Sequence, residues 1–162
     1  MNDKTNSGQI VPEQIIELWK GMYFRAQAGM ERYLVTNFGF SAINEWIDYT
    51  SEISSRQAKL LTVKSTVPFI RNLELIMTCW GSRDVEVKQI EDEQAEIYID
   101  GCGILAYRKN AREMGIELTF DDPCREYCTK LLQRIADKQG LEAQYELEDG
   151  GCVWRTRIAQ QK

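Results

Sequence analysis

Four of the five cysteines lie in the C-terminal half of the chain, and their spacing is that of a shared site. Cys124 and Cys128 are four residues apart, so a helix would place both thiols on one face. Cys102 and Cys152 each lie beside glycines, which permit close approach of the backbone. Free cysteines are also common as small buried apolar residues. We predict that these four converge on one site.

The absence of histidine narrows the chemistry of such a site. The chain contains none, which removes the commonest general base and the commonest metal ligand. Serine or cysteine triads that need imidazole are therefore excluded. All-thiolate ligation suits zinc or an iron–sulfur cluster. The leading hypothesis is a small-molecule-processing or ligand-binding protein whose metal ligands are Cys102, Cys124, Cys128 and Cys152.

Two other hypotheses remain open. In the first, an enzyme without metal uses catalytic thiols from Cys124, Cys128 and Cys102 as a hydrolase or lyase. A thiol at the start of a helix has its pKa lowered by the helix dipole, so Cys124 would attack a carbon–sulfur or acyl bond as a thiolate. In the second, the cysteines are structural and a hydrophobic ligand lies under aromatic helices.

Cys79, in an apolar helix beside Trp80, is predicted to be a buried apolar residue.

A glycine pattern offers an alternative site at residues 101–106, which match G-x-G-x-x-[GA] between an expected strand and an expected helix. Asp121 and Asp122 follow at the distance of a ribose-binding acid. The preceding strand, 96–100, alternates polar and apolar residues, whereas a central parallel strand is nearly all apolar. The chain after Asp122 is also too short for a doubly wound sheet. We therefore favour an antiparallel fold over dinucleotide binding.

Composition and charge exclude further classes. The net charge of −5 argues against nucleic acid as a partner, because phosphate binding requires clustered Lys and Arg. The densest basic group, Arg108, Lys109 and Arg112, has the spacing of a solvated helix face. No apolar run reaches the roughly 20 residues of a membrane span. Residues 1–9 lack the apolar segment of a secretory signal, so we expect a cytoplasmic protein.

The elements that must position the cysteines follow from periodicity. We predict a mobile tail, 1–11, and a single α+β domain, 12–162. In this domain, N-terminal helices pack on an antiparallel sheet made of two hairpins separated by two helices. The predicted helices are 12–34, 41–60, 68–80, 104–114 and 123–139, and the strands are 84–90, 95–101, 142–148 and 152–159.

This arrangement leads to two further expectations, one for the cysteines and one for the N-terminal helices. The hairpin connection would bring the strand ends near Cys102 and Cys152 side by side, with Asp122 and Pro123 starting a helix over them. The N-terminal helices carry more apolar surface than one small sheet can cover, so we expect a homodimer. An aromatic stripe could line a pocket or a dimer interface, but we predict core packing for Trp19, Tyr23, Tyr33 and Trp46.

Short motifs are spread over most of the chain: Leu18-Trp19, Met22-Tyr23, Arg25, Cys102, Cys124-x3-Cys128 and Cys152-Val153-Trp154. This pattern resembles a bacterial superfamily of small cysteine-containing proteins. It includes the L-2-amino-thiazoline-4-carboxylic acid hydrolase-like proteins and the 4-vinyl reductase (hydrocarbon-binding) domains. The resemblance implies an α+β domain, often dimeric, with a ligand pocket between helices and sheet and cysteines at its mouth. Gly103 follows Cys102 where the hydrolase-like branch usually has proline, which argues against that activity.

Overall fold

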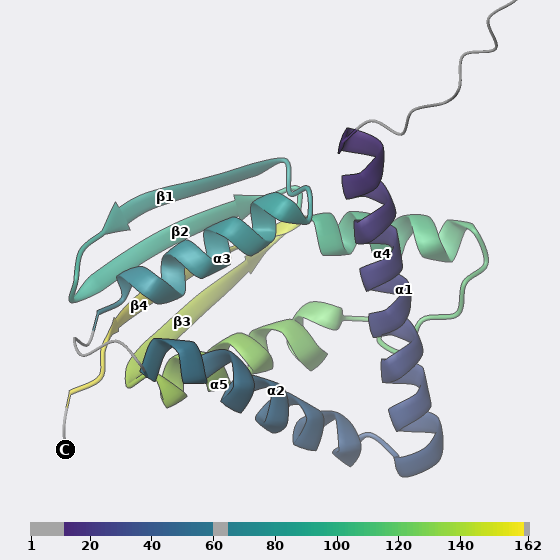
Figure 1. The fold of residues 1–162 in the computed structure, drawn as a ribbon, viewed down its shortest axis with the longest axis horizontal. Helices are drawn as coiled ribbons and strands as arrows, with labels where there is room; N and C mark the ends of the chain where they lie inside the picture. Colours follow the sequence, from purple (N-terminus) through teal and green to yellow (C-terminus); the bar gives the residue numbers. More distant parts are fainter. Residues whose placement is uncertain (1–11, 60–64, 161–162) are drawn as a thin grey trace, which may run out of the picture.

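The computed structural model describes residues 12–59 and 65–160, shown in Figure 1. The predicted mobile tail, 1–11, lies outside the described residues. The elements match the predicted order: helices, hairpin, helices, hairpin. They are α1 (Pro12–Phe38), α2 (Ser41–Lys59), α3 (Val67–Cys79), β1 (Asp84–Ile90), β2 (Gln94–Asp100), α4 (Gly103–Glu113), η1 (Cys124–Cys128), α5 (Thr129–Lys138), β3 (Leu141–Glu148) and β4 (Gly151–Ile158).

The two hairpins form one four-stranded antiparallel sheet in the order β1-β2-β4-β3. Strands β2 and β4 are therefore the central pair, and they join the hairpins across their middle. This arrangement confirms the predicted α+β class. It contains no parallel pair among the described strands, which contradicts the dinucleotide-binding alternative.

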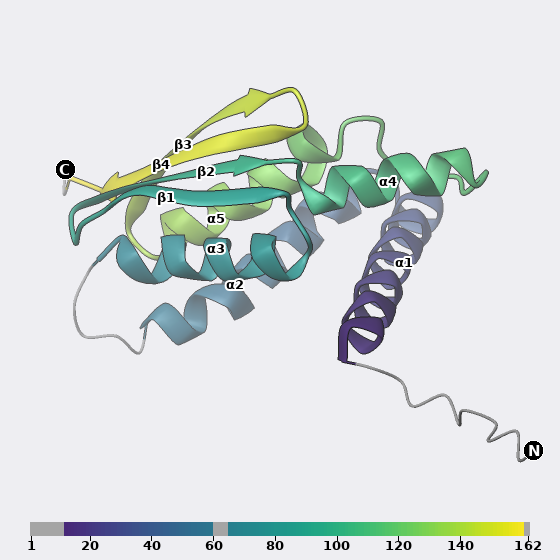
Figure 2. The ribbon, with the colours of Figure 1, turned by 90° about the horizontal axis from the view of Figure 1, so that it is seen from above.

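Helices cover one face of the sheet (Figure 2). Helices α3 and α5 pack on the strands directly, and α2 packs against α5. The covered face alternates as a half-buried strand should, because Ala95, Ile97 and Ile99 of β2 point into the core. Trp154 of β4 and Leu73 of α3 complete this core, each only 1% exposed. The core therefore lies between the sheet and α3 and α5.

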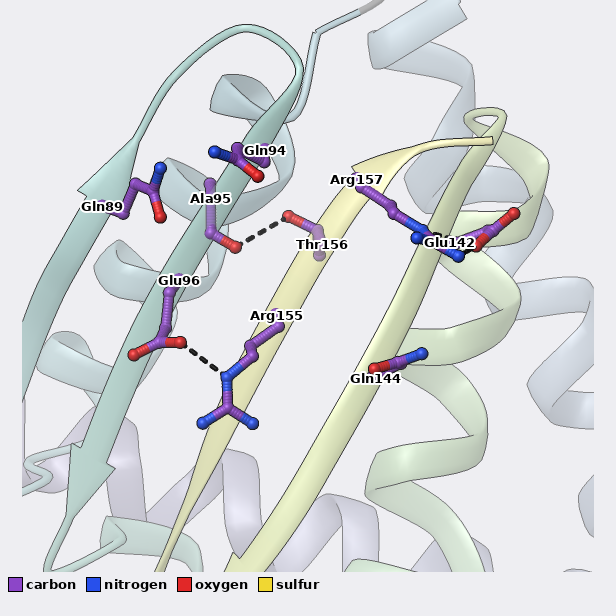
Figure 3. Close-up of a pocket in the computed structure, with 9 residues that line it drawn as sticks. All are labelled: Gln89, Gln94, Ala95, Glu96, Glu142, Gln144, Arg155, Thr156 and Arg157. Atoms are coloured by element: carbon purple, nitrogen blue, oxygen red, sulfur yellow. Dashed lines mark hydrogen bonds and ion pairs between the residues drawn. The ribbon is translucent and has the colours of Figure 1, made fainter. Parts of the chain in front are cut away.

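The opposite face of the sheet carries cross-strand pairs of charged side chains (Figure 3). Arg155 pairs with Glu96 at 2.6 Å and with Glu146 at 2.7 Å, and Arg157 pairs with Glu142 at 2.6 Å. These side chains line a shallow depression, but their charges already pair with one another. Such exposed pairs contribute little stability, and the face is a solvated surface.

Helix α1 does not lie on the sheet, and its first turns project from the body of the protein (Figures 1 and 2). Its middle is anchored where Phe24 stacks on Tyr107 of α4, with ring centroids 4.5 Å apart. The predicted core packing of the aromatic stripe is wrong for Trp19, Tyr23 and Tyr33, which are 65%, 47% and 60% exposed. The described residues leave that face of α1 largely exposed, although the rings of Tyr23 and Trp80 lie 5.3 Å apart between centroids. Among the described residues, no helix has the length and apolarity that a membrane crossing requires.

Candidate functional site

Four cysteines line one small cavity at the end of the sheet where β2 finishes and β4 begins. The cavity has a volume of about 20 Å³, close to the space that one water molecule needs. Its wall is almost entirely apolar apart from the thiols. The lining residues are Met77, Cys102, Ile104, Leu105, Pro123, Cys124, Cys128, Thr129, Leu147, Gly151, Cys152 and Trp154.

Cys102 and Cys152 reach this cavity from neighbouring strands. Cys102 directly follows the turn after β2, and its backbone N–H donates to the carbonyl oxygen of Gly150 at 2.7 Å. Cys152 lies in β4 opposite Ile99 of β2. The antiparallel β2–β4 pairing therefore brings together two cysteines that are 50 positions apart in sequence. This is the arrangement predicted from the hairpin connection.

The glycines beside these cysteines allow the backbones to meet. A Cβ atom on Gly103 would lie 2.1 Å from the carbonyl oxygen of Trp80, and one on Gly151 would lie 2.1 Å from that of Ile99. Real side chains do not tolerate such contacts, so both positions require glycine. The glycine-rich segment at 101–103 thus serves close backbone packing around the cysteine cavity.

Cys124 and Cys128 are the first and last residues of η1, a single π-helical turn. Its defining bond runs from the backbone N–H of Thr129 to the carbonyl oxygen of Cys124. Asp122 caps the turn as predicted, because its Oδ1 atom accepts from the backbone N–H of Arg125 at 3.0 Å. The assumption of a regular α-helix at the two cysteines is wrong. The wider π turn still directs both side chains to the same cavity.

All five cysteines are free thiols. Within the cluster, Cys102 is buried and the other three are partly buried. Cys79 is exposed, so its predicted burial is wrong. Because α3 turns Cys79 away from the sheet, it lies apart from the cavity, and it offers a natural internal control.

Burial dominates the acidity of the clustered thiols. It raises the pKa of Cys124 to about 11 and that of Cys152 to about 12. Burial also raises the pKa of Cys128 well above its usual value, and the neighbouring thiols of the cluster add to this effect. The expectation of a lowered pKa at the start of the helix is wrong for Cys124. Loss of solvation in the apolar cavity is the largest cause of this raised pKa.

Next to the cluster lies a buried ion pair that the sequence did not predict. Arg108 Nη2 of α4 donates to Glu31 Oε1 at 2.8 Å and to Oε2 at 2.6 Å. Glu31 is 0% exposed and Arg108 is 7% exposed, so the predicted solvated face is wrong for Arg108. The sequence did contain one indication of this burial. Arg108 lies between Ile104 and Ala111 at helical spacing, which places it on the apolar stripe of α4.

The positive charge of Arg108 acts on the cluster. It lowers the pKa of Cys124 and Cys128 and so opposes part of the rise that burial causes in both. The site thus combines apolar walls, four thiols from three segments and a nearby guanidinium. In this arrangement no group of three or more His, Cys, Asp or Glu side chains, among residues 12–59 and 65–160, is placed to hold a metal ion.

The chain matches no protein-family model, no curated protein and no solved structure. The superfamily resemblance therefore stays a prediction, and the functional argument depends on the geometry of the site.

Proposed function

We propose that this chain is a small-molecule-processing or ligand-binding protein of the cytoplasm with a metal–thiolate site. Zinc or an iron–sulfur cluster would be held by Cys102, Cys124, Cys128 and Cys152. The observation that carries the proposal is the convergence of these four side chains on one cavity. Reducing conditions in the cytoplasm would keep the thiols free for a metal.

The chemistry of the donor set supports a thiophilic metal. Four thiol groups without imidazole or carboxylate in the cavity wall favour zinc or iron–sulfur ligation over magnesium or calcium. The raised pKa values mean that the Cys124 and Cys152 thiols hold their protons when no cation is present. Binding of a metal would supply the positive charge that favours the thiolate form of these cysteines, with release of their protons to solvent.

The small cavity has room for one ion, but the four thiols must turn towards a common point before they can bind it. Its volume of about 20 Å³ suits a single zinc ion, whereas an iron–sulfur cluster would require the cavity to widen. The side chains are not yet placed as ligands, so uptake requires rotation about their Cα–Cβ bonds. The π turn at Cys124 and Cys128 supports this role, since such turns are frequent at functional sites.

The test is anaerobic purification followed by elemental analysis, an absorption spectrum and X-ray absorption at the metal edge. We expect zinc or iron bound with sulfur neighbours. Each change Cys102→Ser, Cys124→Ser, Cys128→Ser or Cys152→Ser should lower the metal content at least several-fold. Cys79→Ser, outside the cavity, should leave it unchanged. Protein that stays metal-free after anaerobic reconstitution with both metals, while remaining folded, would contradict the proposal.

The metal-free thiol enzyme is less well supported by this geometry. A nucleophilic cysteine needs an accessible thiolate near neutral pH, whereas burial raises the pKa of Cys124 to about 11. Iodoacetamide labelling of the metal-free protein near neutral pH, read by mass spectrometry, distinguishes the metal-binding protein from the thiol enzyme. We expect Cys79 to react before Cys124. Preferential labelling of Cys124 would instead favour the enzyme.

We also propose that the protein forms a homodimer through α1. Six large apolar side chains lie on the projecting half of this helix and are each at least 43% exposed. Their spacing places them on one broad face, which the described residues leave largely exposed. A second copy would bury the face. The residues are Ile15, Ile16, Leu18, Trp19, Met22 and Tyr23.

A further inference from the structure

A second pocket adjoins the cysteine cavity, and we name it the arginine pocket after Arg108. It lies between α1, α3, α4 and the η1–α5 segment, with a volume of about 50 Å³ and an opening to the surface. Most of its wall is apolar, for example Leu73, Trp80 and Leu131. Met77, Ile104, Pro123 and Cys128 line both spaces, so the two are contiguous.

Two buried polar atoms lack hydrogen-bond partners, and both belong to side chains that line this pocket. They are the Nη1 donor of Arg108 and the Oε1 acceptor of Gln27, and both are buried. One nitrogen atom of each of these two side chains binds Glu31. Gln27 Nε2 donates to Glu31 Oε1 at 3.1 Å, and Arg108 Nη2 donates to the same oxygen at 2.8 Å. Native proteins pair nearly all buried polar atoms, because an unpaired one loses its solvation without compensation. A donor and an acceptor are thus left for a ligand.

Charge decides what kind of ligand fits. The guanidinium of Arg108 is already paired with the fully buried carboxylate of Glu31. A second carboxylate in the pocket would leave a net negative charge in an apolar setting, which is costly. A neutral oxygen can accept from Arg108 Nη1 without that penalty. A hydroxyl group can also donate to Gln27 Oε1.

We propose that the arginine pocket binds a small, neutral, mostly apolar molecule with a hydroxyl group. The hydroxyl oxygen accepts a hydrogen bond from Arg108 Nη1, and the hydroxyl proton is donated to Gln27 Oε1. The apolar body lies against Leu73, Trp80 and Leu131 and reaches towards Cys128. This site goes beyond the proposed metal centre and does not need a metal to be bound.

Three fluorinated probes of similar size test the proposal by ¹⁹F NMR titration of the full chain. 4-Fluorophenol carries the hydroxyl, 4-fluorotoluene replaces it with a methyl group, and 4-fluorobenzoate is an anion. We expect 4-fluorophenol to bind about tenfold more tightly than 4-fluorotoluene, as one or two buried hydrogen bonds allow, and more tightly than 4-fluorobenzoate. Equal binding of 4-fluorotoluene, tighter binding of 4-fluorobenzoate, or no binding of 4-fluorophenol would each overturn the proposal.

Variants separate this site from the metal centre. Gln27→Met removes the acceptor and should weaken 4-fluorophenol severalfold while metal content stays unchanged. Cys152→Ser, which is in the cysteine cavity but not in the arginine pocket, should lower metal content and leave 4-fluorophenol binding intact. Unchanged 4-fluorophenol binding in a folded Gln27→Met variant would show that the hydroxyl does not bond to Gln27 Oε1, and it would overturn the proposal.

Discussion

Arg108 of α4 and Glu31 of α1 are 77 positions apart in sequence and form a buried ion pair at 2.6 Å. This pair ties the projecting helix α1 to the helix that begins at the cysteine cavity. It also leaves one guanidinium nitrogen of Arg108 unpaired in the arginine pocket. The stability of α1, the charge near the thiols and the ligand pocket therefore depend on the same contact.

Removing one partner of this pair should destabilise the protein strongly. Glu31→Leu or Arg108→Met would leave an uncompensated buried group, and we expect each to reduce the free energy of unfolding by about 3–5 kcal/mol. The double change Glu31→Leu with Arg108→Met removes both charges and should cost less than the sum of the single changes. Urea unfolding of the four proteins measures the coupling. Strictly additive losses would show that the two residues do not act as a pair.

The cysteine cavity should make the metal-free protein less stable at alkaline pH. A thiol of the unfolded chain has a pKa of 9.0, whereas in the folded protein that of Cys124 is about 11 and that of Cys152 about 12. The folded state thus holds these protons longer, so their contribution is fully present below pH 9 and is lost as the pH rises towards 11 and 12. Urea unfolding between pH 8 and 11 should show this decline, and Cys152→Ala should make it shallower. Identical slopes would contradict the raised pKa of Cys152.

Two glycine changes should have opposite effects. In Gly103→Ala the new methyl group would collide with the carbonyl oxygen of Trp80, and we expect a loss of about 2–4 kcal/mol in unfolding free energy. In Gly29→Ala the methyl group meets nothing within 4 Å, in the middle of α1. That change should stabilise the protein by up to about 1 kcal/mol. Thermal unfolding measures the stability of both variants against the wild type. A Gly103→Ala variant as stable as the wild type would mean that the backbone at the cavity can shift freely.

The apolar face of α1 should mediate self-association. We expect a dimer at micromolar concentration in sedimentation experiments. The double change Leu18→Glu with Trp19→Glu should weaken it about tenfold or more, because it puts charges into the proposed interface. Lys130→Glu, an exposed change on α5, is the matched control and should leave the association unchanged. A wild-type protein that sediments as a monomer would contradict the dimer.

Local sequence signals were sufficient for the order and type of the elements. Periods of three to four residues marked the helices, alternation marked the hairpins, and the predicted sheet strands differ from the observed ones by at most one residue at each end. These signals depend on near neighbours in the chain. The convergence of Cys102 and Cys152 could also be predicted, because two hairpins in one sheet leave few ways to arrange their ends.

The properties of the site were decided by the tertiary structure. The spacing of Cys124 and Cys128 does not distinguish an α-helical turn from the π turn that forms. The spacing also does not show that both thiols lose their solvation in the folded protein. This loss raises their pKa values, whereas a position at the start of a helix predicts lowered ones. Arg108 became buried because Glu31, far away in sequence, provides its counter-charge. Burial and long-range pairing depend on which elements pack together, and the sequence by itself determined the elements but not their packing.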